Sequence, residues 1–234
     1  MTKTEVMRTL RANGSAQTRR IYRRHGVQGD IFGVSYAVLG KLKRKIKVDQ
    51  HLAEQLWATG NGDARALAIK IADPAQMTAA KLNAWARELT DRGTAAGLSN
   101  LAADARSARS LTAQWTKARN EMVACCGWHT LASIARQDNG LDDAYFEQYL
   151  ARIDSEIDRS ANWARYSMNN ALINIGVRNA KLRKAALAVA KRIGKLEIDH
   201  GKTGCRTPDA AAYIAKTVAH KKKLAAKRRR GEES

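Results

Sequence analysis

Apolar residues recur every three or four positions through almost the whole chain, which is the periodicity of amphipathic α-helices. Near residues 35–48, for example, Leu39, Leu42 and Ile46 fall on one helical face, and lysines and arginines surround the other. The pattern predicts helices at about 4–12, 16–24, 35–48, 51–59, 64–72, 78–89, 94–104, 107–118, 120–136, 142–158, 162–176 and 180–193, with a last helix from about 208. We therefore predict an all-α fold.

Local signals place the ends of several of these helices. Ser15 follows Asn13 and Gly14, which is typical of one helix ending and the next being capped. Asp49 and Asp63 are predicted to cap the helices that follow them. The predicted connections are mostly two to six residues long, which favours antiparallel neighbours.

The composition of the helices indicates how they pack. Ala64–Ala72 and Ala185–Ala190 mix alanine with aliphatic residues, and small side chains allow helix backbones to approach closely. Stacked helix pairs of about 40–47 residues are typical of HEAT-like α-solenoids, which wind into a superhelix. An irregular helical bundle is the alternative. We expect residues 1–215 to form a single HEAT-like-repeat domain and residues 216–234 to form a basic C-terminal tail.

The charge of the chain indicates its class of partner. Lys and Arg number 42 against 22 Asp and Glu, which gives a net charge of +20 and a pI of about 10.3. The tail holds eight basic and two acidic residues, so residues 1–215 still carry +14. A polyanion is the expected partner, with DNA or RNA ahead of an acidic membrane surface. A solvated face is the alternative for any single cluster.

Other classes of protein are disfavoured. Cys125, Cys126 and Cys205 cannot form a disulfide framework, and no apolar run approaches the roughly 20 residues that span a bilayer. The first ten residues lack the apolar core of a signal peptide. We expect a reduced, cytoplasmic, monomeric protein with no membrane partner.

No cofactor or metal is expected. Asp199–Cys205 offers metal-ligand residue types, but no second pair stands at zinc spacing. Gly201–Cys205 lacks the spacing of a phosphate-binding P-loop. The five tryptophans, at 57, 85, 115, 128 and 163, lie within apolar helical patterns and are predicted to be core rather than base-stacking platforms, with Trp163 the least buried.

Several segments together resemble the bacterial DNA alkylation repair family, the HEAT-like-repeat DNA glycosylases. They are residues 33–43, 52–68, 71–74, 131–135, 169–176 and the run Asp-His-Gly-Lys-Thr-Gly-Cys-Arg-Thr-Pro-Asp-Ala at 199–210. The resemblance covers about residues 30–215. It implies an ARM-type α-solenoid whose concave, positive face holds duplex DNA. It also implies a hydrolase that releases cationic alkylpurines such as 3-methyladenine and 7-methylguanine by N-glycosidic cleavage.

The residues that carry the family's chemistry are changed in this sequence. The family's active helix bears a Trp-Asp-x-x-Asp type of run, which residues 89–98 lack. Its Trp-Val-Arg-Arg run corresponds to 122–125 here, and the aromatic of its Asn-Trp-Ala-Leu run is replaced by Asn170. No catalytic residue of the family is therefore transferred. Asp91 and Asp199 are the candidates for a substitute carboxylate, although Asp91 also falls where a helix cap is expected.

We expect a DNA-binding protein that recognises alkylated or distorted duplex DNA. The candidate DNA-binding residues are Arg19, Arg20, Arg23, Lys41, Lys43, Arg44, Lys45, His129, Arg165, Tyr166, Asn169, Asn170, Lys202 and Arg206. Two interpretations of Asn169 and Asn170 stay open: they face the DNA, or they form hydrogen bonds between helices. The alternative functions are a glycosylase with a rewired site and a non-catalytic helical scaffold that binds RNA or an acidic protein.

Overall fold

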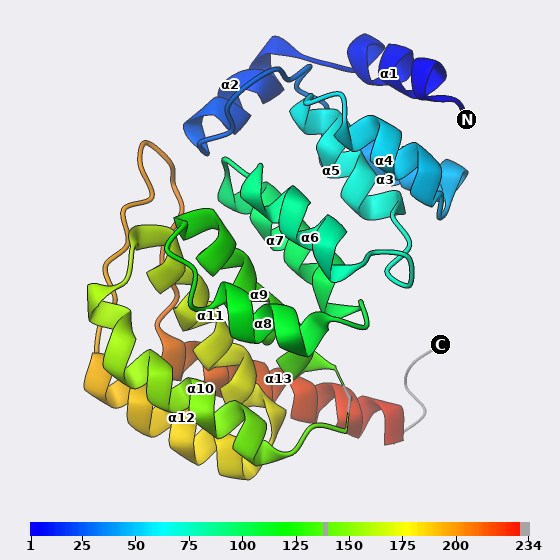
Figure 1. The fold of residues 1–234 in the computed structure, drawn as a ribbon. Coiled ribbons are helices and arrows are strands. Elements are labelled where there is room, and N and C mark those ends of the chain that lie inside the picture. Colours follow the sequence, from blue (N-terminus) through cyan, green and yellow to red (C-terminus); the bar gives the residue numbers. More distant parts are fainter. Residues whose placement is uncertain (138–139, 230–234) are drawn as a thin grey trace. The chain divides into compact units, whose positions relative to one another are not determined.

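The computed structural model describes residues 1–137 and 140–229, which form thirteen α-helices and one 3-10 turn (Figure 1). The helices are α1 (Lys3–Ala12), α2 (Ala16–Arg24), α3 (Tyr36–Ile46), α4 (Gln50–Trp57), α5 (Gly62–Ile71), α6 (Ala79–Arg87), α7 (Arg92–Ala103), α8 (Ala108–Trp115), α9 (Glu121–Arg136), α10 (Asp143–Glu156), η1 (Ile157–Arg159), α11 (Asn162–Arg178), α12 (Ala180–Ile193) and α13 (Ala210–Arg229). The prediction of an all-α fold is confirmed.

The chain divides into two compact units. The first unit comprises residues 1–130 and 200–205, and the second comprises residues 131–199 and those from 206 onward. The division falls within α9. No helix among the described residues combines the length and the apolar character needed to cross a membrane.

Of the caps predicted at Ser15, Asp49 and Asp63, two are confirmed and one is wrong. Ser15 accepts a hydrogen bond from the Thr18 amide, and Asp49 caps α4. The cap of α5 is Asn61 rather than Asp63, because Asn61 Oδ1 accepts from the Ala64 amide at 3.1 Å. Asp63 lies inside the first turn of α5, where it is buried and turned to a different partner.

Helix pairs stack in the first unit, as the small residues predicted. α4 packs on α5 and α6 packs on α7, while α5 also contacts both α3 and α7. A Cβ added at Gly97 of α7 would lie 3.6 Å from Cγ2 of Ile69 on α5, so the two backbones are close. The helices α3, α5 and α7 therefore form a continuous packed row within this unit.

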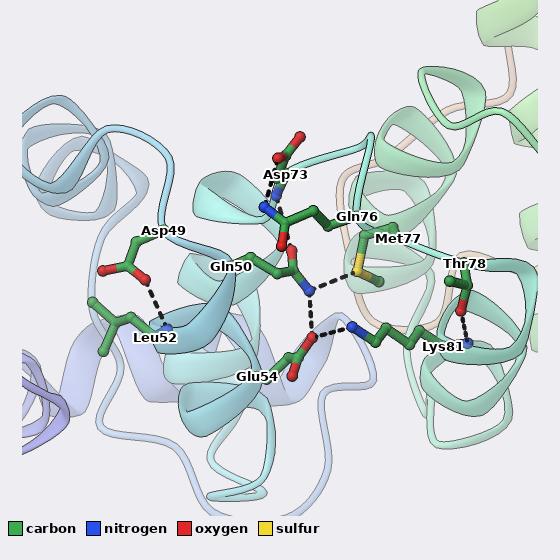
Figure 2. A network of polar contacts seen from close by, with 9 residues as sticks. All are labelled: Asp49, Gln50, Leu52, Glu54, Asp73, Gln76, Met77, Thr78 and Lys81. Atoms are coloured by element: carbon green, nitrogen blue, oxygen red, sulfur yellow. Dashed lines mark hydrogen bonds and ion pairs between the residues drawn. The ribbon is translucent and has the colours of Figure 1, made fainter.

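A polar network holds α4, the connection after α5, and α6 together (Figure 2). Nε2 of the buried Gln50 donates to Glu54 Oε1 at 2.6 Å and to Met77 Sδ at 3.3 Å. Its Oε1 accepts from the Asp73 amide at 3.0 Å. Lys81 Nζ reaches the same Glu54 oxygen from α6 at 2.6 Å. One buried amide thus joins two successive helix pairs.

The tryptophans lie as the sequence predicted. Trp57, Trp85, Trp115 and Trp128 are buried, and Trp163 is half-buried. The Trp57 and Trp85 rings stack with centroids 4.1 Å apart and an interplanar angle of 2°. These two rings serve the core between α4 and α6 and are not available to stack on bases.

The helix α2 is held at its beginning by a backbone hydrogen bond and further along by the hydroxyl of Tyr22. All nine of its residues are described, and none of them is buried. The Ser15 amide donates to the Gly33 carbonyl at 3.0 Å, and Tyr22 Oη donates to the Val34 carbonyl at 2.7 Å. Gly33 has φ +80°, and a Cβ there would lie 2.5 Å from the Ser15 carbonyl oxygen. The close approach of α2 to this turn therefore requires glycine.

The turn at residues 32–34 is fixed in its own place by Asp63. Oδ2 of Asp63 accepts from the amides of Phe32 at 2.6 Å and Gly33 at 2.9 Å, and Oδ1 accepts from the amide of Val34 at 2.9 Å. A carboxylate that accepts three backbone hydrogen bonds in a buried site is a strong anchor. Asp63 therefore connects α5 to the turn that carries α2.

In the second unit, α11 packs on α12 and α13, and α10 packs on α12. Gly176 permits the approach of α13, because a Cβ there would lie 2.6 Å from Ile214 Cδ1 and 2.9 Å from Ala186 Cβ. Ala210 and Ile214 are the buried residues described in α13. The helix continues from Ala210 into the predicted basic tail and ends at Arg229.

Arg178 completes the carboxyl end of α9 in the second unit. Its Nη1 donates to the carbonyls of Ala135 at 3.3 Å and Gln137 at 2.7 Å, and its Nη2 donates to the Leu141 carbonyl at 3.3 Å. Its guanidinium lies 4.6 Å from the centroid of the Phe146 ring. Carbonyls at the end of a helix have no partner inside the helix, so this arginine supplies donors that they need.

We expect Asp63→Asn to destabilise the protein by about 3 kcal/mol, because an amide oxygen replaces a charged acceptor and an NH₂ group then faces a backbone amide. Urea unfolding followed by circular dichroism measures this change. Asp158→Asn, at an exposed position, is the matched control and should leave the midpoint nearly unchanged. An equal effect of the two substitutions would contradict the anchoring role of Asp63.

The stability of the α4–α6 network should depend on pH. Hydrogen bonds from Lys81 and then from Gln50 lower the pKa of Glu54 below its ordinary value of 4.5. The stabilisation by ionised Glu54 is therefore complete above pH 4.5 and is lost as the pH falls through the lowered pKa. The half-exposed pair is worth at most about 1 kcal/mol.

Glu54→Gln should therefore unfold more easily than the parent protein at pH 7, and the difference should shrink in acid below pH 4.5. Urea midpoints measured at a series of pH values test this, and Lys81→Met should give the same trend. A difference that stays constant across the series would show that Glu54 contributes by packing alone.

Candidate nucleic-acid interface

Exposed cations of α2 and α3 form the first part of the candidate site. Lys41, Arg44 and Lys45 stand at i, i+3 and i+4 on α3, on the side opposite the buried Leu39 and Leu42. The set that we call the α2–α3 cations consists of Arg19, Arg20, Arg24, Lys41, Lys43, Arg44 and Lys45, all exposed. Within residues 1–137 and 140–229, the side chains of this set take part in none of the ion pairs or hydrogen bonds. Their charge is therefore turned to solvent.

Arg23 differs from its neighbours on α2. Its Nη1 donates to the Val27 carbonyl at 2.8 Å, and its Nη2 donates to the Gly29 carbonyl at 2.5 Å. The side chain closes the loop that follows its own helix. Arg23 is exposed as predicted, but its donors already serve a structural role.

A small cavity lies where α2, α3, α5 and α7 meet. Its volume is about 30 Å³, and its lining includes Tyr22, Tyr36, Asp63 and Asp91. The two tyrosine rings meet edge to face with centroids 6.1 Å apart. Burial foremost, and then Tyr36 and Asp63, raise the pKa of Tyr22 to about 12, so its hydroxyl keeps the proton that it donates. A cavity of this size has room for about one water molecule.

Asp91 is the N-cap of α7. Its Oδ1 accepts from the Thr94 amide at 2.8 Å, and its Oδ2 accepts from Thr94 Oγ1 at 2.8 Å. The residue is 8% exposed. Both oxygens of this candidate catalytic carboxylate are thus engaged by the helix that it begins, as are both oxygens of the neighbouring Asp63 by the turn at residues 32–34.

Asp199, the second candidate carboxylate, belongs to the second unit. Asn162 holds its backbone from both sides, since Asn162 Nδ2 donates to the Asp199 carbonyl and the Asp199 amide donates to Asn162 Oδ1, each at 2.8 Å. The residue is exposed. This pairing fixes the beginning of the run at 199–210 against the first turn of α11.

The two asparagines of α11 are not equivalent. Asn169 is 4% exposed, and its Nδ2 donates to the Pro208 carbonyl at 3.0 Å. Asn170 is half-buried and accepts from Asn174 Nδ2 through its carbonyl oxygen at 2.7 Å and through its Oδ1 at 3.1 Å. Asn169 therefore matches the structural interpretation, so we leave it out of the proposed interface.

The other predicted site residues lie at various depths. His129, Arg165 and Tyr166 are half-buried, whereas Lys202 and Arg206 are exposed. The Tyr166 ring meets the Trp163 ring edge to face at 6.1 Å. Lys202 belongs to the first unit and Arg206 to the second. The structure thus leaves the α2–α3 cations exposed on two helices of the first unit, and it divides the rest of the predicted set between the units.

A polar cavity in the second unit was missed by the sequence analysis. Its volume is about 320 Å³, and it is lined by Ala135, Arg136, Gln137, Arg178, Asn179 and Lys221. These residues come from the ends of α9 and α11 and from the middle of α13, and no sequence spacing connects them. In the described part of the chain, no group of three or more His, Cys, Asp or Glu residues is placed to hold a metal ion.

Known proteins resemble this chain over nearly its whole length. A family model described as DNA alkylation repair enzyme matches residues 6–225. The chain belongs to the DNA alkylation repair enzyme family. Two uncharacterised proteins, one from Listeria innocua and one from Listeria monocytogenes, are each 28% identical to this chain over 214 residues. The matched region is 88% of this chain and 93% of each relative.

A solved structure matches this family member with a TM-score of 0.85 and 26% sequence identity, over 94% of this chain and 95% of the other. That protein is described as one of "a new family of proteins related to the HEAT-like repeat DNA glycosylases with affinity for branched DNA structures". The match confirms the predicted HEAT-like helical fold.

The role of Asp91 can be tested by two substitutions. Asp91→Ala should destabilise the protein by about 1 kcal/mol, because α7 loses its cap, whereas Asp91→Asn should have a much smaller effect, because asparagine caps helices almost as well. Thermal unfolding measures both changes. Neither variant should bind duplex DNA differently from the parent protein in fluorescence anisotropy, and a loss of binding in Asp91→Asn would contradict a purely structural role.

Proposed function

We propose that this protein binds DNA through its exposed cations, recognises duplexes whose backbone is distorted or branched, and does not excise bases. The observation that carries the proposal is the exposed and uncompensated charge of the α2–α3 cations. Residues 1–48 contain 12 Lys and Arg against two Asp and Glu. Such a surface attracts a polyphosphate backbone and gains further from the release of its counterions.

Membership of the DNA alkylation repair enzyme family supports DNA as the polyanion. The described affinity of the structural neighbour for branched DNA supports the preference for a non-standard backbone. A protein that binds mainly through phosphates gains selectivity from the shape and deformability of DNA rather than from base edges. Alkylated or otherwise weakened duplexes belong to the same class of deformable substrate.

The carboxylates beside the cavity of the first unit do not favour base excision. Release of a cationic purine requires a group that stabilises positive charge as the sugar becomes oxocarbenium-like. Asp91 and Asp63 give all four of their oxygens to amide or hydroxyl donors of the fold. The cavity beside them, at about 30 Å³, has room for a water molecule but not for a purine.

Removal of α3 cations should weaken DNA binding in a salt-dependent manner. The slope of log affinity against log salt is negative for such binding. We expect Lys41→Ala/Arg44→Ala/Lys45→Ala to make it less steep by about 0.9 for each phosphate that the variant no longer touches, so by about 2–3 in total. Fluorescence anisotropy between 50 and 200 mM salt, on a linear duplex and on a four-way junction, measures this.

The control for this experiment is Lys181→Ala/Lys195→Ala, which removes cations that already face Glu147 and Glu197. Its salt slope should stay close to that of the parent protein. Equal reductions in both variants would mean that net charge alone governs binding. Binding to RNA or to an acidic protein, with no binding to DNA, would contradict the proposal.

Incubation with methylated duplex DNA tests the catalytic half of the proposal. We expect no release of free 7-methylguanine or 3-methyladenine above the rate seen without protein, measured by chromatography of the soluble fraction. Release that is abolished by Asp91→Asn or Asp199→Asn would instead identify a glycosylase and the carboxylate on which it depends.

A further inference from the structure

The second unit carries another concentration of positive charge, on α13 and around the cavity next to Lys221. We propose that this is a second surface for the DNA backbone, so that one chain holds two duplex segments at once. The inference rests on the proposed function and goes beyond it, because it assigns a second site and a stoichiometry.

The distribution of charge along the chain is uneven. Residues 1–48 hold 12 basic and two acidic residues, and residues 210–229 hold seven basic residues and no acidic residue. The 161 residues between them hold 22 basic and 18 acidic residues. The excess charge of the protein is therefore concentrated in two separate segments, one in each unit.

The geometry of α13 presents this charge to solvent. The buried Ala210 and Ile214 hold its first turns, and Lys216, Lys221, Lys222, Lys223 and Lys227 are all exposed. Lys216, Lys223 and Lys227 stand at i, i+7 and i+11 along one face of α13, whereas Lys221 stands on the face that carries the buried Ala210 and Ile214 and lines the cavity. A helix of 20 residues is about 30 Å long, so this row can follow several phosphates of a backbone.

The cavity beside α13 has the chemistry of a phosphate site. Arg136, Arg178 and Lys221 line it, and the lining residues that belong to the described part of the chain include no carboxylate. Hydrogen bonds to Ser133 and to the carbonyls at the end of α9 hold the two guanidinium groups in place. Positive groups that are already fixed lose little conformational entropy when they bind an anion. The volume of about 320 Å³ has room for a phosphate group.

Two surfaces on one chain account for a preference for branched DNA. When one surface holds a duplex arm, a junction offers the other surface a second arm at a high effective concentration, whereas a short linear duplex does not. The preference then arises from bivalent binding and does not require recognition of the branch point itself. It also requires that each surface bind a duplex independently.

The decisive measurement is the number of duplexes bound per chain. Native mass spectrometry of the full chain with an excess of a linear duplex of about 12 base pairs should show two duplexes bound to one chain. Lys221→Ala/Lys222→Ala/Lys223→Ala should bind one duplex, and so should Lys41→Ala/Arg44→Ala/Lys45→Ala. Alanine has the highest helix propensity, so both variants are expected to keep their helices, which circular dichroism checks.

The affinity ratio between a four-way junction and the linear duplex gives a second readout. In the parent protein it should be at least about tenfold, and in either triple variant it should fall to about twofold or less. The control Lys181→Ala/Lys195→Ala should keep both the stoichiometry and the ratio, because those two lysines lie outside the two surfaces and are paired with glutamates.

The outcomes separate the two proposals. One duplex per parent chain would overturn the second surface and leave the proposed function standing. Two duplexes found only on pairs of chains, or two duplexes still bound by the Lys221–Lys223 variant, would also overturn it. No binding to either DNA would contradict the proposed function itself.

Discussion

The helix α2 carries four arginines and buries none of its residues fully, so hydrogen bonds to a neighbouring turn are needed to hold it. α2 is kept in place by the turn at residues 32–34, and that turn is kept in place by the carboxylate of Asp63. The negative charge of Asp63 is therefore used on backbone amides rather than on the arginines nearby. As a result, Arg19, Arg20 and Arg24 stay turned to solvent while the helix itself is fixed.

The acidic residues of this protein mostly build the fold. Asp49 and Asp91 cap helices, Glu54 joins two helix pairs, and Asp154 forms an ion pair with Arg192. The resemblance to the DNA glycosylases implies a carboxylate that is left for the reaction. Here the scaffold of the family is retained, and the carboxylates that face the small cavity are committed to amide and hydroxyl donors. The same use of negative charge leaves the α2–α3 cations without an ion pair among the described residues.

The sequence predicted most of the helices because their periodicity and their caps are local. Ser15 and Asp49 cap the helices that follow them, and both rules depend only on residues within one turn. The cap predicted at Asp63 was wrong because the partners of its carboxylate lie about 30 residues earlier in the chain. Asn61 caps α5 instead. Asn169 was ambiguous for a similar reason, since its acceptor, the Pro208 carbonyl, lies on a distant segment.

The candidate site was predictable only where it depends on composition. The exposure of Lys41 and Lys45 follows from the helical pattern of α3, because packing of its apolar face against the core leaves the opposite face exposed to solvent. The cavity in the second unit joins Arg136, Arg178 and Lys221 from three helices, and no spacing along the chain encodes that meeting. The depth of each predicted side chain likewise depends on packing that periodicity does not describe.

The packing of Ile214 against Gly176 determines how the charged carboxyl-terminal helix is oriented. In a flexible tail the lysines would sample many directions, so each contact with a DNA backbone would be opposed by a loss of conformational entropy of the protein chain. A rod that is wedged at its base keeps its lysines in a fixed relation to α11 instead. A single missing methyl group in α11 thus sets the direction in which positive charge up to about 20 Å further along the rod is held.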